Sequence, residues 1–255
     1  LSALFVSQAT FAQIVPFQND EGKYGFKNES GNIIVEPTFG RADSVNGYGF
    51  AMNWSEEECF VFDPAGEQIL SYGEKFGRAE LRHVAENVFV FVGEANRSGK
   101  VTSWITDHSG NVIKEFSGRP TEILENNLIV AEWEKERTLD DRSYATDTWV
   151  MDFEGNVLIP KGYAYMVSVT KDRFLVCKGE WEMYDAKTSL KMIRKMTNPR
   201  KQNDPRLYQL KGQWGIIDLQ GNEVIPFEYT FLTHVHNADG NEYIIGGSSC
   251  DGTVV

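Results

Sequence analysis

The chain has 255 residues and a formal net charge of −12 at pH 7. Proteins that bind a nucleic-acid backbone present a positive surface to its phosphates, so this acidic balance argues against a nucleic-acid partner. No run of apolar residues is long enough to cross a bilayer as a helix, which argues against an internal transmembrane segment. A chain of this length can bury a large core within one all-β domain.

The first twelve residues resemble the end of a secretory signal peptide. An apolar stretch leads to Ala12 at the expected cleavage position, with Thr10 two residues before it. We therefore expect export to the periplasm or cell surface, with a mature chain that starts at Gln13. In the alternative, Phe11 to Phe17 is simply the first strand and the protein is cytoplasmic.

One short phrase recurs along residues 13–255. It consists of an aromatic strand, an Asp or Asn, two variable residues, a Gly and a short β-branched or apolar run. The clearest copies run from Tyr24 to Ile34 and from Trp214 to Pro226, and weaker copies cover residues 60–70, 104–114, 149–160 and 181–193. Such a repeat predicts a single β-repeat domain of about six units.

The phrase has a physical explanation as a hairpin. The Asp or Asn side chain accepts from a backbone N–H two residues on, a type I turn follows, and Gly adopts the left-handed conformation that closes the hairpin. In the copy at 181–193, Thr188 stands in the Gly position. Trp214 and Ile216 share one face of their predicted strand, so the aromatic residue is expected to pack in the core.

Each repeat is predicted to hold four antiparallel strands. One set comprises residues 48–54, 59–63, 68–72 and 80–85, and the last set comprises 206–210, 214–218, 223–226 and 231–236. Asn46-Gly47 and Lys211-Gly212 are turn-like links between such strands, and helix-period runs are absent. We expect an all-β fold of repeated antiparallel β-meander units.

Two architectures suit these units. A β-propeller-like arrangement fits four strands per repeat and a last unit that closes on the first. An open β-solenoid or superhelical array, in which the last unit is truncated, is the alternative.

The phrase resembles the WG-repeat family, whose unit runs roughly G-K-W-G-x-I-D-x-x-G-x-x-V-I-P. The match is close at Gly212 to Pro226 and at Gly22 to Pro37, where Tyr24 replaces Trp. The four middle copies mostly shift the aromatic residue by one place and lose the second Gly. The resemblance implies a binding or scaffolding module and supplies no catalytic residues.

No reactive constellation emerges from the sequence, and we predict no enzyme activity, metal or cofactor. His234 and His236 alternate on one strand, but no third ligand lies near them in sequence. Calcium is the alternative role for the four aspartates of the phrase, which turn capping already explains. These are Asp63, Asp107, Asp152 and Asp218.

The three cysteines lie far apart, without a metal-binding or redox spacing. Cys59 and Cys177 fall in strand patterns, where a buried free thiol is the expected outcome. If two of the three cysteines formed a disulfide, one thiol would remain unpaired among Cys59, Cys177 and Cys250.

Two insertions are the candidate binding sites, because insertions on one face of a repeat array usually carry specificity. They are the predicted loops Glu132 to Asp147 and Lys195 to Pro205, the second of which is locally basic. The partner-binding candidates within them are Trp133, Lys135, Arg137, Arg200 and Lys201.

Three functions fit these patterns. The first is a non-catalytic interaction module, exported and acting as an accessory subunit of a cell-envelope or surface assembly. The second is a carbohydrate-binding or carbohydrate-cleaving propeller, in which Trp54, Trp133 and Trp181 stack on sugar rings and Glu132 and Asp152 form a carboxylate pair. The third is an intracellular repeat protein that binds other proteins.

Overall fold

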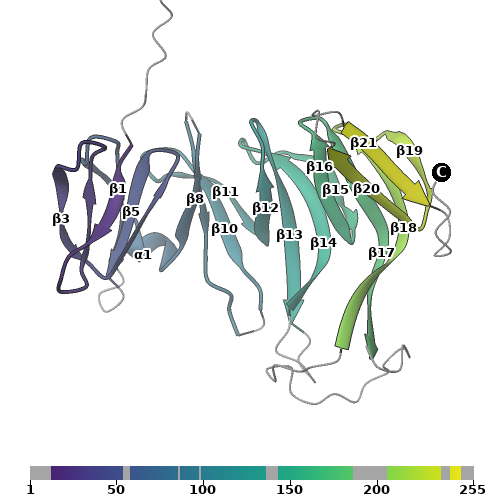
Figure 1. The fold of residues 1–255 in the computed structure, drawn as a ribbon, viewed down its shortest axis with the longest axis horizontal. Helices are drawn as coiled ribbons and strands as arrows, with labels where there is room; N and C mark the ends of the chain where they lie inside the picture. The colour runs from purple at the N-terminus through teal and green to yellow at the C-terminus, as the bar shows by residue number, and fades with distance from the viewer. Residues whose placement is uncertain are drawn as a thin grey trace, which may run out of the picture. The chain divides into compact units, whose positions relative to one another are not determined.

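The computed structural model of the chain describes residues 13–53, 58–85, 87–97, 99–135, 143–185, 206–236 and 242–247 (Figure 1). For residues 133–135, 143–146, 180–185, 206–211, 235–236 and 242–243 it describes the backbone alone. Strands dominate these segments, and their one α-helix is the single turn α1 (Gly73–Phe76). The prediction of an all-β fold is confirmed.

The described strands form six antiparallel sheets. The first sheet contains β1 (Val15–Gln18), β2 (Tyr24–Lys27) and β3 (Ile33–Phe39). The second contains β4 (Arg41–Val45), β5 (Tyr48–Asn53), β6 (Glu58–Phe62) and β7 (Gln68–Ser71). The third contains β8 (Glu80–Val84), β9 (Phe89–Val92), β10 (Thr102–Thr106) and β11 (Val112–Ser117).

The remaining sheets follow the same order. The fourth contains β12 (Arg119–Ile123), β13 (Asn127–Lys135), β14 (Ser143–Asp152) and β15 (Val157–Tyr163). The fifth contains β16 (Tyr165–Thr170), β17 (Arg173–Asp185), β18 (Arg206–Asp218) and β19 (Glu223–Tyr229). The last pairs β20 (Phe231–His236) with β21 (Glu242–Gly247). Every complete sheet is therefore a four-stranded meander.

The chain divides into two compact units. The first unit comprises residues 1–94 and 103–115, and the second comprises residues 95–102 and 116–255. A propeller-like or an open arrangement of the sheets stays a prediction.

The predicted repeats are displaced from the sheets by one strand. Residues 80–85 and 231–236 were expected to complete a sheet, whereas β8 and β20 each begin the next one. The reason is visible at the corners Gly40, Ala164 and Thr230. Their backbone N–H groups donate to carbonyl oxygens on the second strand of the following sheet, at Met52 (3.1 Å), Cys177 (3.0 Å) and Gly247 (2.8 Å). The chain thus joins the new sheet within one residue.

The phrase strand is consequently the third strand of each sheet, and the Asp-x-x-Gly turn joins it to the fourth. In the first sheet, β2 carries the phrase, so β1, β2 and β3 correspond to the second, third and fourth strands elsewhere. Among the described residues, the first sheet has no counterpart of β4, and β1 is its edge strand.

Two predicted breaks between strands are wrong. Residues 206–218 form one continuous strand, because Lys211 and Gly212 pair with Glu180 and Gly179 on β17 instead of turning. A Cβ on Gly212 would overlap the backbone at Lys178 and Gly179, so glycine here allows the two strands to approach closely.

The predicted loop Glu132 to Asp147 is also mostly a hairpin. Trp133 pairs with Ala145 and Lys135 pairs with Ser143, leaving only residues 136–142 outside the described chain. The strand portion of the sixth phrase copy, residues 181–185, is likewise the far end of β17, and Thr188 lies outside the described residues.

Aromatic residues fill the cores, although most of the fully buried ones lie outside the phrase. Of the aromatic residues of the phrase, Trp149 is buried, whereas Trp214 is half-buried and packs against Ile216 on the same face of its strand. In the first unit, Phe50, Tyr72, Phe76, Phe89 and Phe91 belong to one cluster of buried side chains. In the second unit, Phe174 packs among aliphatic side chains that include Ile129, Val150 and Ile217. Each such side chain contributes about 2–3 kcal/mol by leaving water, which makes the sheets the main source of stability.

Candidate partner-binding surface

The turn between the third and fourth strands has the same backbone hydrogen bonds in all five complete copies of the phrase. At Asp218, Oδ1 accepts from the backbone N–H groups of Gln220 (2.9 Å) and Asn222 (2.8 Å), and the Gly221 N–H donates to the Asp218 carbonyl (2.9 Å). The glycines have φ between 78° and 88°. They are Gly31, Gly66, Gly110, Gly155 and Gly221.

The turn-capping prediction is therefore confirmed for Asp63, Asp107, Asp152 and Asp218, whose side chains all accept from backbone N–H groups. In Asp107 and Asp218 the side-chain amides of Asn111 and Asn222 donate to the other carboxylate oxygen. These hydrogen bonds, with those from the backbone, lower the pKa of both carboxyl groups. The turn residues thus act in the scaffold.

The glycine of the Tyr24-Gly25 and Trp214-Gly215 pairs has a different role. A Cβ at Gly25 would lie 2.5 Å from the Val35 carbonyl oxygen, and one at Gly215 would lie 2.7 Å from that of Ile225. The strands that follow the turn, β3 and β19, both bulge at this point. Tyr24 and Phe26 pair with Phe39 and Val35 in the first sheet, and the fifth sheet has the same shift in register next to Trp214. The bulged backbone occupies the space that a side chain would need.

The fourth sheet replaces this glycine with Trp149. Its fourth strand bulges at the same place, because Thr148 pairs with Tyr163 and Val150 with Ile159. Here the glycine is on the opposite strand, at Gly162 (φ 139°), where the bulge leaves open space around it. This exchange explains why the copy in the fourth sheet carries the aromatic residue one place later. In the second sheet the equivalent residue, Phe60, pairs with Ser71 without a bulge.

The hairpin between the second and third strands varies in length between sheets, whereas the turn between the third and fourth strands keeps its backbone hydrogen bonds. It spans residues 19–23, 54–57, 93–101, 136–142 and 186–205 in successive sheets, from 4 to 20 residues between strand ends. This segment, and not the turn, differs most between repeats.

A pair of these hairpins in the second unit, β13–β14 and β17–β18, extends past the sheets on the same side (Figure 1). In the fifth sheet, β16 pairs with β17 only as far as Cys177, and β19 pairs with β18 only as far as Trp214. Among the described strands, β17 from Lys178 to Asp185 therefore pairs with β18 alone. These eight residues make a two-stranded ribbon about 26 Å long.

The predicted binding residues lie on or beyond these hairpins. Trp133 and Lys135 are on the far end of β13, and their side chains are outside the described structure. Arg137 falls in residues 136–142, and Arg200 and Lys201 fall in residues 186–205, which are not described. The aromatic candidates Trp54 and Trp181 are likewise without a described side chain.

Charged and aromatic side chains surround the base of the β13–β14 hairpin. Glu132 forms an ion pair with Lys161 and accepts from the Ser117 hydroxyl (2.7 Å), while the Lys161 ammonium lies 4.3 Å from the centre of the Trp149 ring. Burial of Glu132 raises the pKa of its carboxyl, but the hydrogen bonds from Lys161 and Ser117 outweigh burial and lower it overall.

A second group lies at the base of the β17–β18 ribbon. The Lys178 ammonium is 3.6 Å from the centre of the Phe227 ring and 3.5 Å from the Glu223 carboxylate. Tyr163 stacks on Phe227 from the neighbouring sheet, with ring centres 6.2 Å apart. Burial, and then the negative charge of Glu223, raise the pKa of Tyr163. Sequence reasoning missed both groups, because their members are far apart in the chain.

The proposed carboxylate pair Glu132 and Asp152 is wrong as a glycosidase site. Asp152 pairs with Asn127 at one end of β13, so Glu132 lies five residues further along that strand. Along the strand, this places the two residues about 17 Å apart, whereas the two carboxyl groups of a glycosidase are roughly 5–9.5 Å apart. Glu132 is also engaged with Lys161, and Asp152 caps its turn.

The remaining predictions concern metal ligands, the cysteines and membrane-spanning helices. In the described portions of the chain, no group of three or more His, Cys, Asp or Glu side chains could hold a metal ion. Cys59 and Cys177 are buried and form no disulfide within the described chain, and burial raises the pKa of the Cys177 thiol to about 11. Cys250 lies outside the described residues. No helix among those described is long and apolar enough to span a membrane.

Residues 24–53 and 214–238 match the model of the WG containing repeat family. The chain contains WG repeats. These stretches include the Tyr24-Gly25 and Trp214-Gly215 pairs, so the bulge that requires glycine coincides with the stretches that match the family model.

No curated protein matches the chain. One solved structure that matches the chain is the crystal structure of a eukaryotic initiation factor, with 10% sequence identity and a TM-score of 0.45. The similarity covers 91% of this chain and 56% of that protein, so the chain spans just over half of its length.

Proposed function

We propose that the protein is a non-catalytic interaction module, exported and acting as an accessory subunit of a protein assembly at the cell envelope or surface. Its partner binds the ends of the β13–β14 and β17–β18 hairpins. The binding residues are Trp133, Lys135 and Arg137 on the first hairpin and Arg200 and Lys201 on the second.

The observation that carries this proposal is the ribbon formed by β17 and β18. Holding two strands about 26 Å beyond a sheet forfeits pairing with a third strand, and such a projection suits contact with another molecule better than stabilisation of its own domain.

The charge of the connecting sequence indicates the chemistry of the partner. Residues 186–205 contain six Lys or Arg residues and one acidic residue, Asp204, although the whole chain has a net charge of −12. A basic segment on an acidic protein favours an acidic protein surface, which it can select by charge complementarity while the rest of the chain repels the wrong partners.

The decisive experiment is a gentle affinity purification of the tagged protein from membrane and soluble fractions, followed by mass spectrometry of the proteins that accompany it. We expect stoichiometric envelope proteins in the membrane fraction. The double variant Arg200→Glu/Lys201→Glu should reduce their recovery at least about tenfold, since reversing two rim charges costs more than one decade of affinity.

A matched control reverses one charge elsewhere. Lys23→Glu changes an exposed side chain in the short β1–β2 turn and should leave partner recovery unchanged. A protein that is recovered alone, or only from the cytoplasm, would overturn the proposal. A broad glycan panel would then test the carbohydrate-binding alternative directly.

A further inference from the structure

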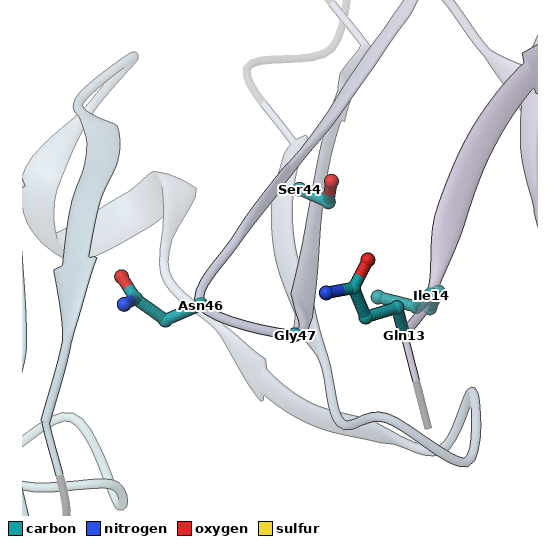
Figure 2. A pocket seen from close by; sticks show the side chains of 5 residues that line it. All are labelled: Gln13, Ile14, Ser44, Asn46 and Gly47. Atoms are coloured by element: carbon teal, nitrogen blue, oxygen red, sulfur yellow. The ribbon is translucent and has the colours of Figure 1, made fainter. Parts of the chain in front are cut away.

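A cavity of about 350 Å³ lies beside the start of β1 (Figure 2). It is lined by Gln13 and Ile14 at one side and, at the other, by Ser44 of β4 and by Asn46 and Gly47 of the β4–β5 turn. The lining therefore offers amide and hydroxyl groups next to one aliphatic side chain.

The two residues that open the described chain differ sharply in their surroundings. Ile14 is 1% exposed and packs in a cluster with Phe26, Phe39 and Phe62. Gln13 is exposed, and its amide makes no hydrogen bond to another described residue. The fold thus holds the chain from Ile14 onward and leaves the side chain of Gln13 available for reaction.

We propose that Gln13 becomes the N-terminal residue of the mature protein and cyclises to pyroglutamate, with the ring seated at this cavity. The proposal rests on the export stated above, because cleavage after Ala12 is what exposes the α-amine of Gln13.

The reaction needs no other reagent. The α-amine attacks the side-chain carbonyl carbon Cδ, the new N–Cδ bond closes a five-membered lactam, and the side-chain nitrogen leaves as ammonia. An α-amine has a pKa of about 7.7–8.0, so a useful fraction is unprotonated and nucleophilic at neutral pH. Attack within one residue also has the high effective concentration of an intramolecular reaction.

The cavity suits the product. Cyclisation replaces a charged ammonium with a neutral lactam that has one N–H donor and carbonyl acceptors, which the hydroxyl of Ser44 can pair with. The Asn46 amide points away from Gln13, and its Oδ1 accepts from the Val84 N–H (3.5 Å). Because Ile14 is buried, an exopeptidase can reach only residue 13, and the closed ring removes the amine that such an enzyme recognises. The mature chain should therefore have one uniform, blocked N-terminus.

The test is mass spectrometry of the N-terminal peptide from the exported protein, purified with its native leader. The expected peptide begins at residue 13, has a mass lower by one ammonia and is resistant to a general aminopeptidase. Gln13→Ala is the control: it should give the same start site with the full calculated mass and a free amine.

The possible outcomes separate the two proposals. A peptide that begins at Gln13 and keeps its ammonia after prolonged incubation at neutral pH overturns the ring and leaves export intact. A peptide that retains residues 1–12 overturns export through this cleavage. In that case a chain released at Gln13 from a cleavable fusion decides the cyclisation itself, which is overturned if the amine stays free.

Discussion

The turn between the third and fourth strands and the hairpin between the second and third strands are under different constraints in this molecule. The first has the same backbone hydrogen bonds and the same left-handed glycine in five sheets. The second ranges from 4 to 20 residues between strand ends. In the fifth sheet the far ends of its two strands extend beyond the other strands of the sheet.

The difference shows where the fold depends on sequence. The turn sets the register of the third and fourth strands, and a slip of one residue would move every core side chain to the other face. A hairpin that extends past the sheet sets no such register, so its length and composition are available for binding.

The largest expected effect comes from the glycine beside the bulge. In Gly215→Val a Cβ would lie 2.7 Å from the Ile225 carbonyl oxygen, and the opposing backbone cannot move without breaking its bulge. We expect a loss of about 3 kcal/mol in the free energy of unfolding. Urea denaturation followed by circular dichroism measures it, and Gln213→Val, at an exposed position two residues earlier, should change it little.

A smaller loss is expected at the turn glycine itself. Gly221 has φ of 82°, and a Cβ added there would have nothing within 4 Å, so Gly221→Ala tests backbone conformation without a clash. The left-handed conformation should cost alanine about 1 kcal/mol. The same denaturation experiment on Gln220→Ala provides the control, and equal stability of the two variants would contradict the role given to the turn.

The turn aspartates should make stability depend on acid. The pKa of Asp218 is below its usual 3.8 in the folded chain, so its contribution is present above the unfolded pKa and is lost as pH falls through the folded one. Asp218→Asn keeps a side-chain oxygen at the position that Asn28 occupies in the first turn. In the unaltered protein the urea midpoint should decline as pH falls below about 4, and we expect this decline to be smaller in the variant. An unchanged decline would mean that other carboxyl groups cause the loss of stability.

Local patterns predicted the repeating elements well. The alternation around Trp214 and the Asp-x-x-Gly spacing identified the phrase strands and their turns, because both depend on residues close together in sequence. The limits of the sheets were displaced, since β8 and β20 join the sheet that follows through pairing partners further along the chain.

The binding surface was only partly predictable. The polar sequence around Trp133 and the turn-like Lys211-Gly212 lack the one-sided apolar alternation that marks a strand packed on a core, so a paired ribbon was interpreted as loops and turns. Lys178 and Phe227 are brought together by the order of strands in the fifth sheet, which no spacing in the sequence reveals.

Shortening the long hairpins should have the smallest effect on stability, and it is the strongest test of the contrast between the turn and the hairpin. Trp181 pairs with Leu210, so replacing residues 182–209 with Asn-Gly closes the ribbon on a tight two-residue turn without altering the four-stranded portion of the sheet. In the described part of the removed segment, residues 182–185 and 206–209 pair only with each other, and the free energy of unfolding should therefore change by less than about 1 kcal/mol. The matched variant replaces residues 134–144 between Trp133 and Ala145 in the same way. If both chains keep their urea midpoints but lose their partners, the long hairpins serve binding; a loss of about 3 kcal/mol in either would instead make that hairpin part of the fold.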